Sequence, residues 1–288
     1  MWYLMENVQR SYTLSERLLR AIGIGNGGTR HEQEDVEDLI RQGADVNQSH
    51  GTFLPLHCAC MVGDASNVSI LLKWGASVNR YDGYHRSALH HAVERSAECV
   101  RLLLSAGADT ESTDINRNTP LHWAAFRNRA DCCRLLLENN ALADSLDFNN
   151  DTPLNWAAMK GNYASVKVLL EYNASPDIKN YSGMLPLTRV AILLATGLET
   201  PEDEQSFELL LRGMGKVELR DRQGLLPSVL DRDGKLRTRL LSMCSSPRPL
   251  VQLGRHAVRR SLRQRHLPTI VPTLPIPERL QEFVLLES

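Results

Sequence analysis

The sequence lacks the marks of a membrane or secreted protein. No apolar stretch approaches the ~18 residues that a spanning helix needs. Residues 1–10, MWYLMENVQR, contain no basic region followed by an apolar one. The six cysteines have a spacing that suggests no disulfide framework in a chain of 288 residues, so we expect reduced thiols. These absences predict a soluble, intracellular protein of the cytoplasm.

A strong net charge is also lacking. The formal charge of −1 gives no overall field that would favour nucleic acid or a membrane surface. The charge is uneven, however, because residues 247–288 carry +4 and residues 1–246 carry −5. We therefore treat the last part of the chain as a different kind of segment. With 42% apolar residues, the chain as a whole can bury a sizeable core.

Five similar segments recur along the chain: FLPLHCAC, SALHHAVE, TPLHWAAF, TPLNWAAM and LPLTRVAI. Their aligned residues, spaced by 33, 32, 33 and 33 positions, are Pro55, Ala88, Pro120, Pro153 and Pro186. The TPLH signature and the period of about 33 residues resemble the ankyrin repeat. This resemblance implies an all-α solenoid of paired helices joined by hairpin-like loops.

The residue types around each repeat agree with that architecture. Ser87, Thr119 and Thr152 stand where a hydroxyl can cap a helix, and Pro120 and Pro153 follow at the first helical position. A second helix is expected to carry the leucine pairs 71–72, 103–104, 136–137 and 169–170. It should end at residues that accept a left-handed backbone, namely Gly75, Gly107, Asn140 and Asn173.

The two ends of the repeat array are less regular. At the N-terminal end we predict a lone second helix at 36–47, paired with a helix at 13–22 that opens with a Thr13…Glu16 capping box. At the other end, residues 207–213 are the expected second helix of the fifth repeat. The acidic stretch 197–206 is predicted to be an inserted loop before it.

One glycine-rich stretch formally matches a nucleotide-binding motif. Residues 23–28 read GIGNGG, but G-x-G-x-x-G binds dinucleotides only between a strand and a helix. Here a predicted helix precedes the stretch and the charged sequence TRHEQED follows it. We therefore predict a flexible loop.

Histidine and cysteine residues suggest zinc in only one place, the sequence HCAC at 57–60. No second pair at ligand spacing completes a four-ligand site. His57, His90 and His122 share one repeat column, in which ankyrin proteins place a structural imidazole hydrogen bond. Because the columns account for every histidine and cysteine of the repeats, we predict no metal, no cofactor, no catalytic residue and no enzyme.

An arginine-rich run, RHAVRRSLRQR at 255–265, could be a nucleic-acid patch or a localisation signal. On a helix from about 249 to 263, one face would carry Leu250, Leu253, Gly254, Ala257, Val258 and Leu262. The opposite face would carry Gln252, His256, Arg259 and Arg263, which we interpret as the solvated side of an amphipathic helix. No aromatic residue is available to stack on a base, so we predict no nucleic acid partner.

The motif Leu274-Pro275-Ile276-Pro277 fixes an extended backbone. Its prolines remove two backbone donors, so it can join neither a helix interior nor a central strand. Ile276 on a pre-set backbone could dock on a partner at little entropic cost. A terminal segment that merely packs on its own domain could look the same.

The amphipathic helix and the proline motif together resemble a SOCS box. Residues 249–258 match the elongin-binding pattern, with Leu250 at the key leucine and Gly254 where most members have cysteine. The resemblance assigns elongin binding to Leu250, Leu253, Gly254, Ala257 and Val258. It assigns cullin-five binding to Leu274, Pro275, Ile276 and Pro277, and a closing helix to 280–286.

Ankyrin repeats followed by a SOCS box resemble the ankyrin repeat and SOCS box protein family, over nearly the whole chain. The resemblance implies a non-catalytic substrate receptor of a ubiquitin ligase that binds elongin B, elongin C and cullin-five with its RING partner, and marks an unidentified protein for proteasomal degradation. A plain ankyrin scaffold that tethers two partners without ubiquitination is the alternative. The predicted domains are a capping helix and loop (1–34), ankyrin repeats (35–213, with full repeats at 52–81, 85–113, 117–146 and 150–179), a connector (214–234) and the SOCS box (235–288).

The substrate surface is expected on the concave groove of the repeats. In ankyrin proteins that groove is lined by columns that hold here Cys58, Met61, His91, Trp123, Phe126, Arg127, Trp156, Met159 and Lys160. Trp, Met and Arg are enriched at binding hot spots. We predict substrate contacts from Trp123, Phe126, Arg127, Trp156 and Met159, extended by hairpin-tip residues such as Tyr84 and Phe148. The alternative is that the two tryptophans simply pack on each other.

Overall fold

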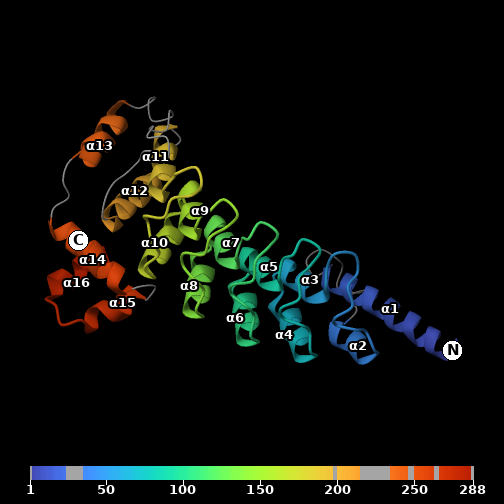
Figure 1. Ribbon diagram of the computed structural model, residues 1–288. Helices are drawn as coiled ribbons and strands as arrows, with labels where there is room; N and C mark the ends of the chain where they lie inside the picture. Colours follow the sequence, from blue (N-terminus) through green and yellow to red (C-terminus); the bar gives the residue numbers. More distant parts are fainter. Residues whose placement is uncertain are drawn as a thin grey trace. The chain divides into compact units, whose positions relative to one another are not determined.

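A computed structural model describes residues 2–23, 35–196, 200–214, 234–245, 250–262 and 266–286 of the chain (Figure 1). The described residues form helices, with isolated β-bridges only at two hairpin loops. They fall into two compact units, residues 1–120 and 121–288. The third repeat begins in the first unit and continues in the second.

The first unit consists of helix pairs stacked in two layers. One layer holds α1 (Trp2–Gly23), α3 (Pro55–Val62) and α5 (Ala88–Arg95). The other holds α2 (Val36–Arg41), α4 (Ala65–Lys73) and α6 (Ala97–Ser105), which Figure 1 shows side by side. The core between the layers buries one leucine from each helix of a repeat: Leu56, Leu71, Leu89 and Leu103.

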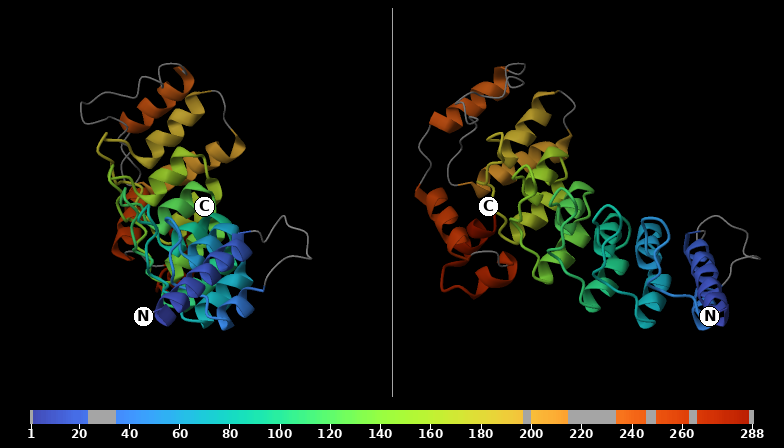
Figure 2. Two further views of the ribbon diagram at one scale, coloured as in Figure 1. Left: turned by 90° about the vertical axis from the view of Figure 1, so that its right-hand side faces the viewer. Right: turned by 45° about the vertical axis from the view of Figure 1, so that its right-hand side comes forward.

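The second unit consists of further helix pairs and the C-terminal helices (Figure 2). Its repeat helices are α7 (Pro120–Phe126), α8 (Ala130–Glu138), α9 (Pro153–Met159), α10 (Tyr163–Glu171), α11 (Pro186–Ala195) and α12 (Pro201–Gly213). The C-terminal helices are α13 (Gly234–Ser245), α14 (Leu250–Leu262), α15 (Leu267–Ile270), the 3₁₀ turn η2 (Val271–Thr273) and α16 (Glu278–Leu285). α14 packs on α16 and on α12, so the C-terminal helices contact the last repeat.

The predicted starts and ends of the repeat helices are confirmed. Four helices begin at the aligned prolines, and the Thr152 hydroxyl accepts a hydrogen bond from the Asn155 N–H. The expected left-handed residues have φ of 83° at Gly75 and Gly107, 68° at Asn140 and 61° at Asn173. These helices therefore end at residue types, glycine and asparagine, that tolerate positive φ.

Two predictions at the ends of the array are wrong. α1 begins at Trp2, so Thr13 lies inside a helix and its hydroxyl donates to the Gln9 carbonyl, an alternative open to threonine within a helix. The acidic stretch is largely helical, because α12 begins at Pro201 behind a Thr200–Asp203 capping box. Most of the glycine-rich stretch 23–28 and of the connector 214–234 lies outside the described residues.

No helix in the described part of the chain combines the length and apolar character required to cross a membrane.

Core packing predicts a large stability effect at Leu154. This side chain is 0% exposed, and truncating a buried leucine costs about 2–5 kcal/mol through lost burial and a residual cavity. We expect Leu154→Ala to lower the urea concentration at the midpoint of unfolding, as followed by circular dichroism. Leu142, which is 52% exposed, is the matched control, and an equal shift in Leu142→Ala would contradict the assignment of the core.

Candidate protein-docking sites

The repeat histidines form a structural column. The Nε2 atoms of His57, His90 and His122 lie 3.1, 3.0 and 3.1 Å from backbone carbonyl oxygens at the start of the following repeat. In His90 the Nδ1 accepts from the Ser87 N–H, so its Nε2 donates and the ring is neutral. Burial lowers the pKa of both His57 and His90 to about 4. The predicted structural role of this column is confirmed.

Burial of these rings makes the repeats sensitive to acid. The pKa of His90 falls from 6.5 to about 4 on folding, so between these values the unfolded chain binds a proton that the folded chain does not. The free energy of unfolding therefore has its full value above pH 6.5. It decreases as the pH drops towards 4, by about 3 kcal/mol for one histidine. Urea titrations from pH 7 to pH 4.5 measure this.

The matched variants for the acid effect are His90→Asn and His85→Asn. His85 is exposed and its backbone has a positive φ of 57°, which asparagine accepts. His90→Asn should reduce the pH dependence of the urea midpoint without abolishing it, because the pKa of His57 is lowered in the same way, and His85→Asn should leave it unchanged. A wild-type midpoint that stays constant over this range would contradict the neutral buried histidines.

The cysteines of the 57–60 stretch are poor ligands or nucleophiles as they stand. Burial raises the pKa of Cys58 to about 11, and it raises the pKa of Cys60 well above its ordinary value. Both thiols are therefore protonated at neutral pH, whereas metal binding and nucleophilic attack use the thiolate. Within the described residues, no group of three or more His, Cys, Asp or Glu side chains could hold a metal ion.

The predicted groove residues of the second unit form an aromatic cluster, which we call the aromatic ridge: Trp123, Phe126 and Trp156. The centroids of Trp123 and Phe126 lie 5.7 and 5.4 Å from that of Trp156, all with steep ring angles. The Trp156 indole N–H donates to Asp147, which fixes its orientation. The three rings are half-buried, so they pack on each other and also keep exposed surface.

Cations border the aromatic ridge. The Lys160 Nζ lies 4.9 Å, and the Arg127 guanidinium carbon 5.7 Å, from the Phe126 ring centroid. Both side chains are exposed, and Met159 beside them is half-buried. At the tip of the neighbouring hairpin, Phe148 is 69% exposed. The arrangement offers apolar surface with a positive border.

The first unit has a pocket at the repeat positions that correspond to those of the aromatic ridge. It has a volume of about 390 Å³ and is lined by Phe53, Met61, Tyr84, Arg86, His91, Glu94 and Arg95. His91 is held by a 2.9 Å contact with Asp82, and Tyr84 is 60% exposed at a hairpin tip. The repeat columns pointed to Met61, His91 and Tyr84. Phe53, Arg86, Glu94 and Arg95 were missed, because side chains from other columns turn towards the same space.

The predicted elongin-binding residues do not all share one environment. Leu250 opens α14, and Leu253, Gly254 and Ala257 are exposed on it. Val258 instead is half-buried against a small core of Leu267, Val271 and Val284. The exposed stripe of α14 therefore consists of residues 253, 254 and 257.

The prediction that Arg259 is solvated is wrong. Arg259 is 5% exposed, and its guanidinium donates to the carbonyl oxygens of Leu170 at 2.6 Å and Val284 at 2.9 Å. Arg255, 4% exposed, stacks 3.4 Å above the Phe283 ring. This face of α14 is buried because it packs on α12 and α16. His256 is half-buried beside Asp177, while the side chains of Gln252 and Arg263 lie outside the described part.

Burial, followed by the nearby Arg255, lowers the pKa of Arg259 to about 10. The guanidinium is therefore still protonated at neutral pH, and it lies among the carbonyls of two helix ends. Carbonyls at helix ends carry the negative end of the helix dipole, and the Leu170 carbonyl accepts from the Asn173 N–H at 3.0 Å in addition to the guanidinium. The site is suited to a buried cation.

The proline motif has one exposed and one packed side. Pro275 and Pro277 are exposed, whereas Leu274 and Ile276 are half-buried against the Leu267 core. The Ile276 carbonyl also accepts from the Gln281 side chain. The segment is thus anchored to the C-terminal helices, with its prolines facing outwards.

Comparison with known families matches both parts of the chain. A model of ankyrin repeats in three copies matches residues 27–114 and 106–180. A model described as the SOCS box matches residues 246–285, which include α14, α15 and α16.

Curated relatives match along almost the full length. The chain is 51% identical over 286 residues to human "Ankyrin repeat and SOCS box protein 8", covering 99% of this chain and 98% of the relative. It is 50% identical to the mouse protein of that name over the same coverage. A shorter match, 37% identical over 91 residues, covers 31% of this chain and 20% of human "Ankyrin repeat and SOCS box protein 16".

Proposed function

This chain belongs to the ankyrin repeat and SOCS box protein family, and from that membership we propose that it is the substrate-recognition subunit of an elongin B/C–cullin-five–RING ubiquitin ligase. Ankyrin repeats with a SOCS box support a substrate-adaptor role, and a SOCS box implies elongin B/C and cullin binding in general. The choice of cullin-five, and degradation of the target by the proteasome, are parts of the proposal.

The single observation that carries the proposal is the exposed stripe of α14. Residues 250, 253, 254 and 257 follow the i, i+3, i+4, i+7 pattern of one helix face. In most helices of a folded domain an apolar face is buried, yet Leu253 is 43% exposed and Gly254 and Ala257 are exposed beside it. Such a face suits a helix groove on a partner, as elongin C would offer.

Co-purification is the test that separates the ligase adaptor from a plain ankyrin scaffold. The full-length chain should recover elongin B, elongin C and cullin-five from cells. Recovery of none of them would favour the scaffold, in which the ankyrin groove still binds a partner but no ubiquitin is transferred.

Cullin choice is proposed to depend on the proline motif. Replacing Pro275 and Pro277 by alanine frees a backbone that then has to be ordered on binding, at about 1–2 kcal/mol per residue. We expect cullin-five recovery to fall about tenfold or more, while elongin recovery is retained because α14 is unchanged. Pulldown with purified cullin-five and elongin B/C measures both.

The matched control for the proline motif is Pro272→Ala, at an exposed proline in η2. It should leave both partners bound. Equal loss of elongins and cullin in the Pro275/Pro277 variant would mean that the motif only supports the box internally.

A cytoplasmic location is part of the proposal. Cys58, Cys60, Cys99, Cys132 and Cys133 are free thiols, as a reducing compartment favours. Microscopy of the tagged chain would test it.

A further inference from the structure

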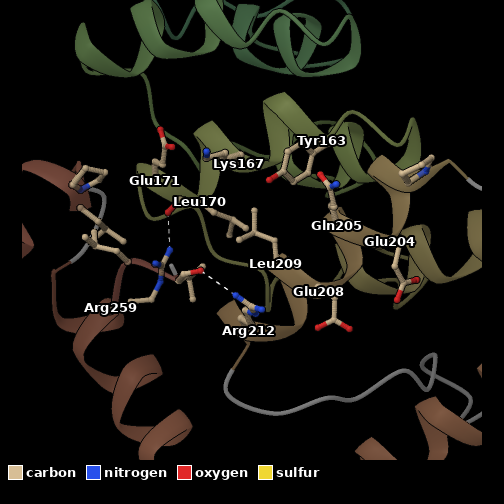
Figure 3. Close-up of a pocket in the computed structure, with 15 residues that line it drawn as sticks. Tyr163, Lys167, Leu170, Glu171, Glu204, Gln205, Glu208, Leu209, Arg212 and Arg259 are labelled. Carbon is tan, nitrogen blue, oxygen red and sulfur yellow. Dashed lines mark hydrogen bonds between the residues drawn. The ribbon is translucent and has the colours of Figure 1, made fainter. Parts of the chain in front are cut away.

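Several side chains cross between the repeats and the SOCS box, in a contact that we call the seam. The seam joins α10 and α12 of the repeats to α14 and α16 of the box, all in the second unit. Arg259 of α14 donates to Leu170 of α10 and to Val284 of α16. Figure 3 shows the Arg259 guanidinium directed at the Leu170 carbonyl, and Arg212 of α12 reaching an oxygen across the seam.

Other hydrogen bonds of the seam surround Arg259. The Asn173 side chain donates to the Arg259 carbonyl oxygen at 2.6 Å. Arg255 donates to the Arg212 carbonyl, and Arg212 donates to the Leu286 carbonyl, both at 3.4 Å. Arg259 is therefore the most densely bonded member, with short contacts to two repeat residues and one box residue.

The geometry of Arg259 suits a fixed joint. Leu170 lies in the last turn of α10 and Val284 in the last turn of α16, so both acceptors are carbonyls at helix ends. A planar guanidinium presents its N–H groups in a rigid fork, which sets the distance and angle between two acceptors. A lysine ammonium also has several donors, but its flexible stem does not impose such a geometry. The residue thus holds the ends of α10 and α16 in one arrangement.

The same helix faces outwards with its proposed elongin stripe. Leu253, Gly254 and Ala257 are exposed on α14, while Arg255 and Arg259, one helical turn apart, face the seam. Any rotation or displacement of α14 on the repeats therefore changes the direction in which a bound ligase points from the aromatic ridge.

We propose that Arg259 is a positioning residue, which fixes the orientation of the SOCS box relative to the substrate-binding repeats through the carbonyls of Leu170 and Val284. This inference rests on the proposed function for its consequence, since a fixed orientation restricts which lysines the ligase can reach. The seam itself is independent of that function, so it can be tested alone.

The variants are chosen to loosen the seam without touching either docking surface. Arg259→Met removes the hydrogen bonds that the guanidinium donates and keeps a long apolar side chain. Arg260→Met is its control at an exposed neighbour. Asn173→Gly is the second variant, because glycine retains the left-handed backbone at φ 61°. Its matched control is Asn140→Gly, at φ 68° in the equivalent position of the preceding repeat.

The first measurement is a distance between the repeats and the box in the full chain. Spin labels are attached through genetically encoded unnatural residues at Ala164 of α10 and Ser261 of α14, which are both exposed. Pulsed electron paramagnetic resonance should give one narrow distance distribution for the wild type and both controls. In Arg259→Met the displaced population should rise about tenfold, the size expected for losing hydrogen bonds from a buried charged group. Asn173→Gly should show a smaller rise.

A single narrow distribution in folded Arg259→Met would overturn the inference. If that variant does not fold, Asn173→Gly decides: broadening relative to Asn140→Gly supports the seam, and identical distributions overturn it. Melting of the repeats is followed by circular dichroism in each case.

The second measurement uses the chain's own lysines as acceptors. With purified elongins, cullin-five, its RING partner and a charged ubiquitin-conjugating enzyme, mass spectrometry gives the ratio of modification at Lys160, Lys167 and Lys179. We expect Arg259→Met to bind elongins as the wild type does and to change that ratio several-fold. An unchanged ratio in a chain that binds elongins overturns the positioning role. Failure of the wild type itself to bind elongins would instead contradict the proposed function, and the distance measurement would still decide the seam.

Discussion

The Leu250→Asp variant is expected to lose elongin B and elongin C in co-purification, while its repeats remain folded. Leu250 opens α14 and stands three residues before the exposed stripe of Leu253, Gly254 and Ala257. A leucine buried in a partner's apolar pocket contributes about 2–5 kcal/mol, and a carboxylate placed there adds a desolvation cost. Recovery of elongins should therefore fall by about a hundredfold or more.

The control for this loss is the same substitution on another exposed leucine. Leu142→Asp lies on the repeats, where the wild-type side chain is 52% exposed, and it should leave elongin recovery unchanged. Retention of elongins by Leu250→Asp would show that the assigned helix is not the elongin-binding one.

Gly254 provides an independent check of the register of α14. A Cβ built at Gly254 meets no atom within 4 Å, so a side chain fits there without disturbing the box. Replacing glycine in a helix interior also favours the helix by up to about 1 kcal/mol. Gly254→Cys should bind elongins at least as tightly as the wild type. A large loss would place the partner's surface elsewhere on the helix.

Local sequence signals predicted the repeats well because each acts within a few residues. A proline at the first helical position and a glycine or asparagine at the left-handed end determine where a helix begins and ends, whatever surrounds it. Pro153 and Asn173 behave in this way. The histidine column followed from the period of the repeat, because the same carbonyl recurs one repeat later.

The face of α14 could not be predicted in the same way. Arginine at one side of an amphipathic pattern usually faces solvent, but Arg259 bonds to carbonyls that lie 89 and 25 residues away in the sequence. Nothing close to Arg259 in the chain signals those acceptors. Val258 shows a related ambiguity of the pattern, since an apolar face can serve the domain's own core as well as a partner.

Among the substrate contacts, the aromatic ridge is the strongest candidate, and replacing both tryptophans by alanine is expected to remove substrate recruitment. Trp123 and Trp156 are half-buried in contact with each other, so they combine a fixed orientation with exposed apolar area. Large, rigid side chains of this kind dominate binding energies, with losses of about 2 kcal/mol or more on truncation. Elongin and cullin-five recovery should not change, because α14 and the proline motif are untouched.

Substrates can be followed before their identity is known. Affinity purification with the proteasome blocked defines the proteins that the wild type retains, and the Trp123→Ala/Trp156→Ala variant should lose that set together with their ubiquitination. Trp74→Ala is the control, at a tryptophan that is 39% exposed at the end of α4. It should retain the same proteins.

The structural cost of the double variant has to be separated from its effect on binding. Edge-to-face pairs contribute about 0.5–1.5 kcal/mol each beyond their burial, so a lower melting temperature is expected. Lys160→Glu changes only the exposed, positive border of the same surface, 4.9 Å from the Phe126 ring, and should leave the melt unchanged. Reduced recruitment by Lys160→Glu at a wild-type melting temperature would confirm the groove. If Lys160→Glu binds normally and the tryptophan variant loses substrates only in proportion to its unfolding, the rings serve the core and substrates bind elsewhere.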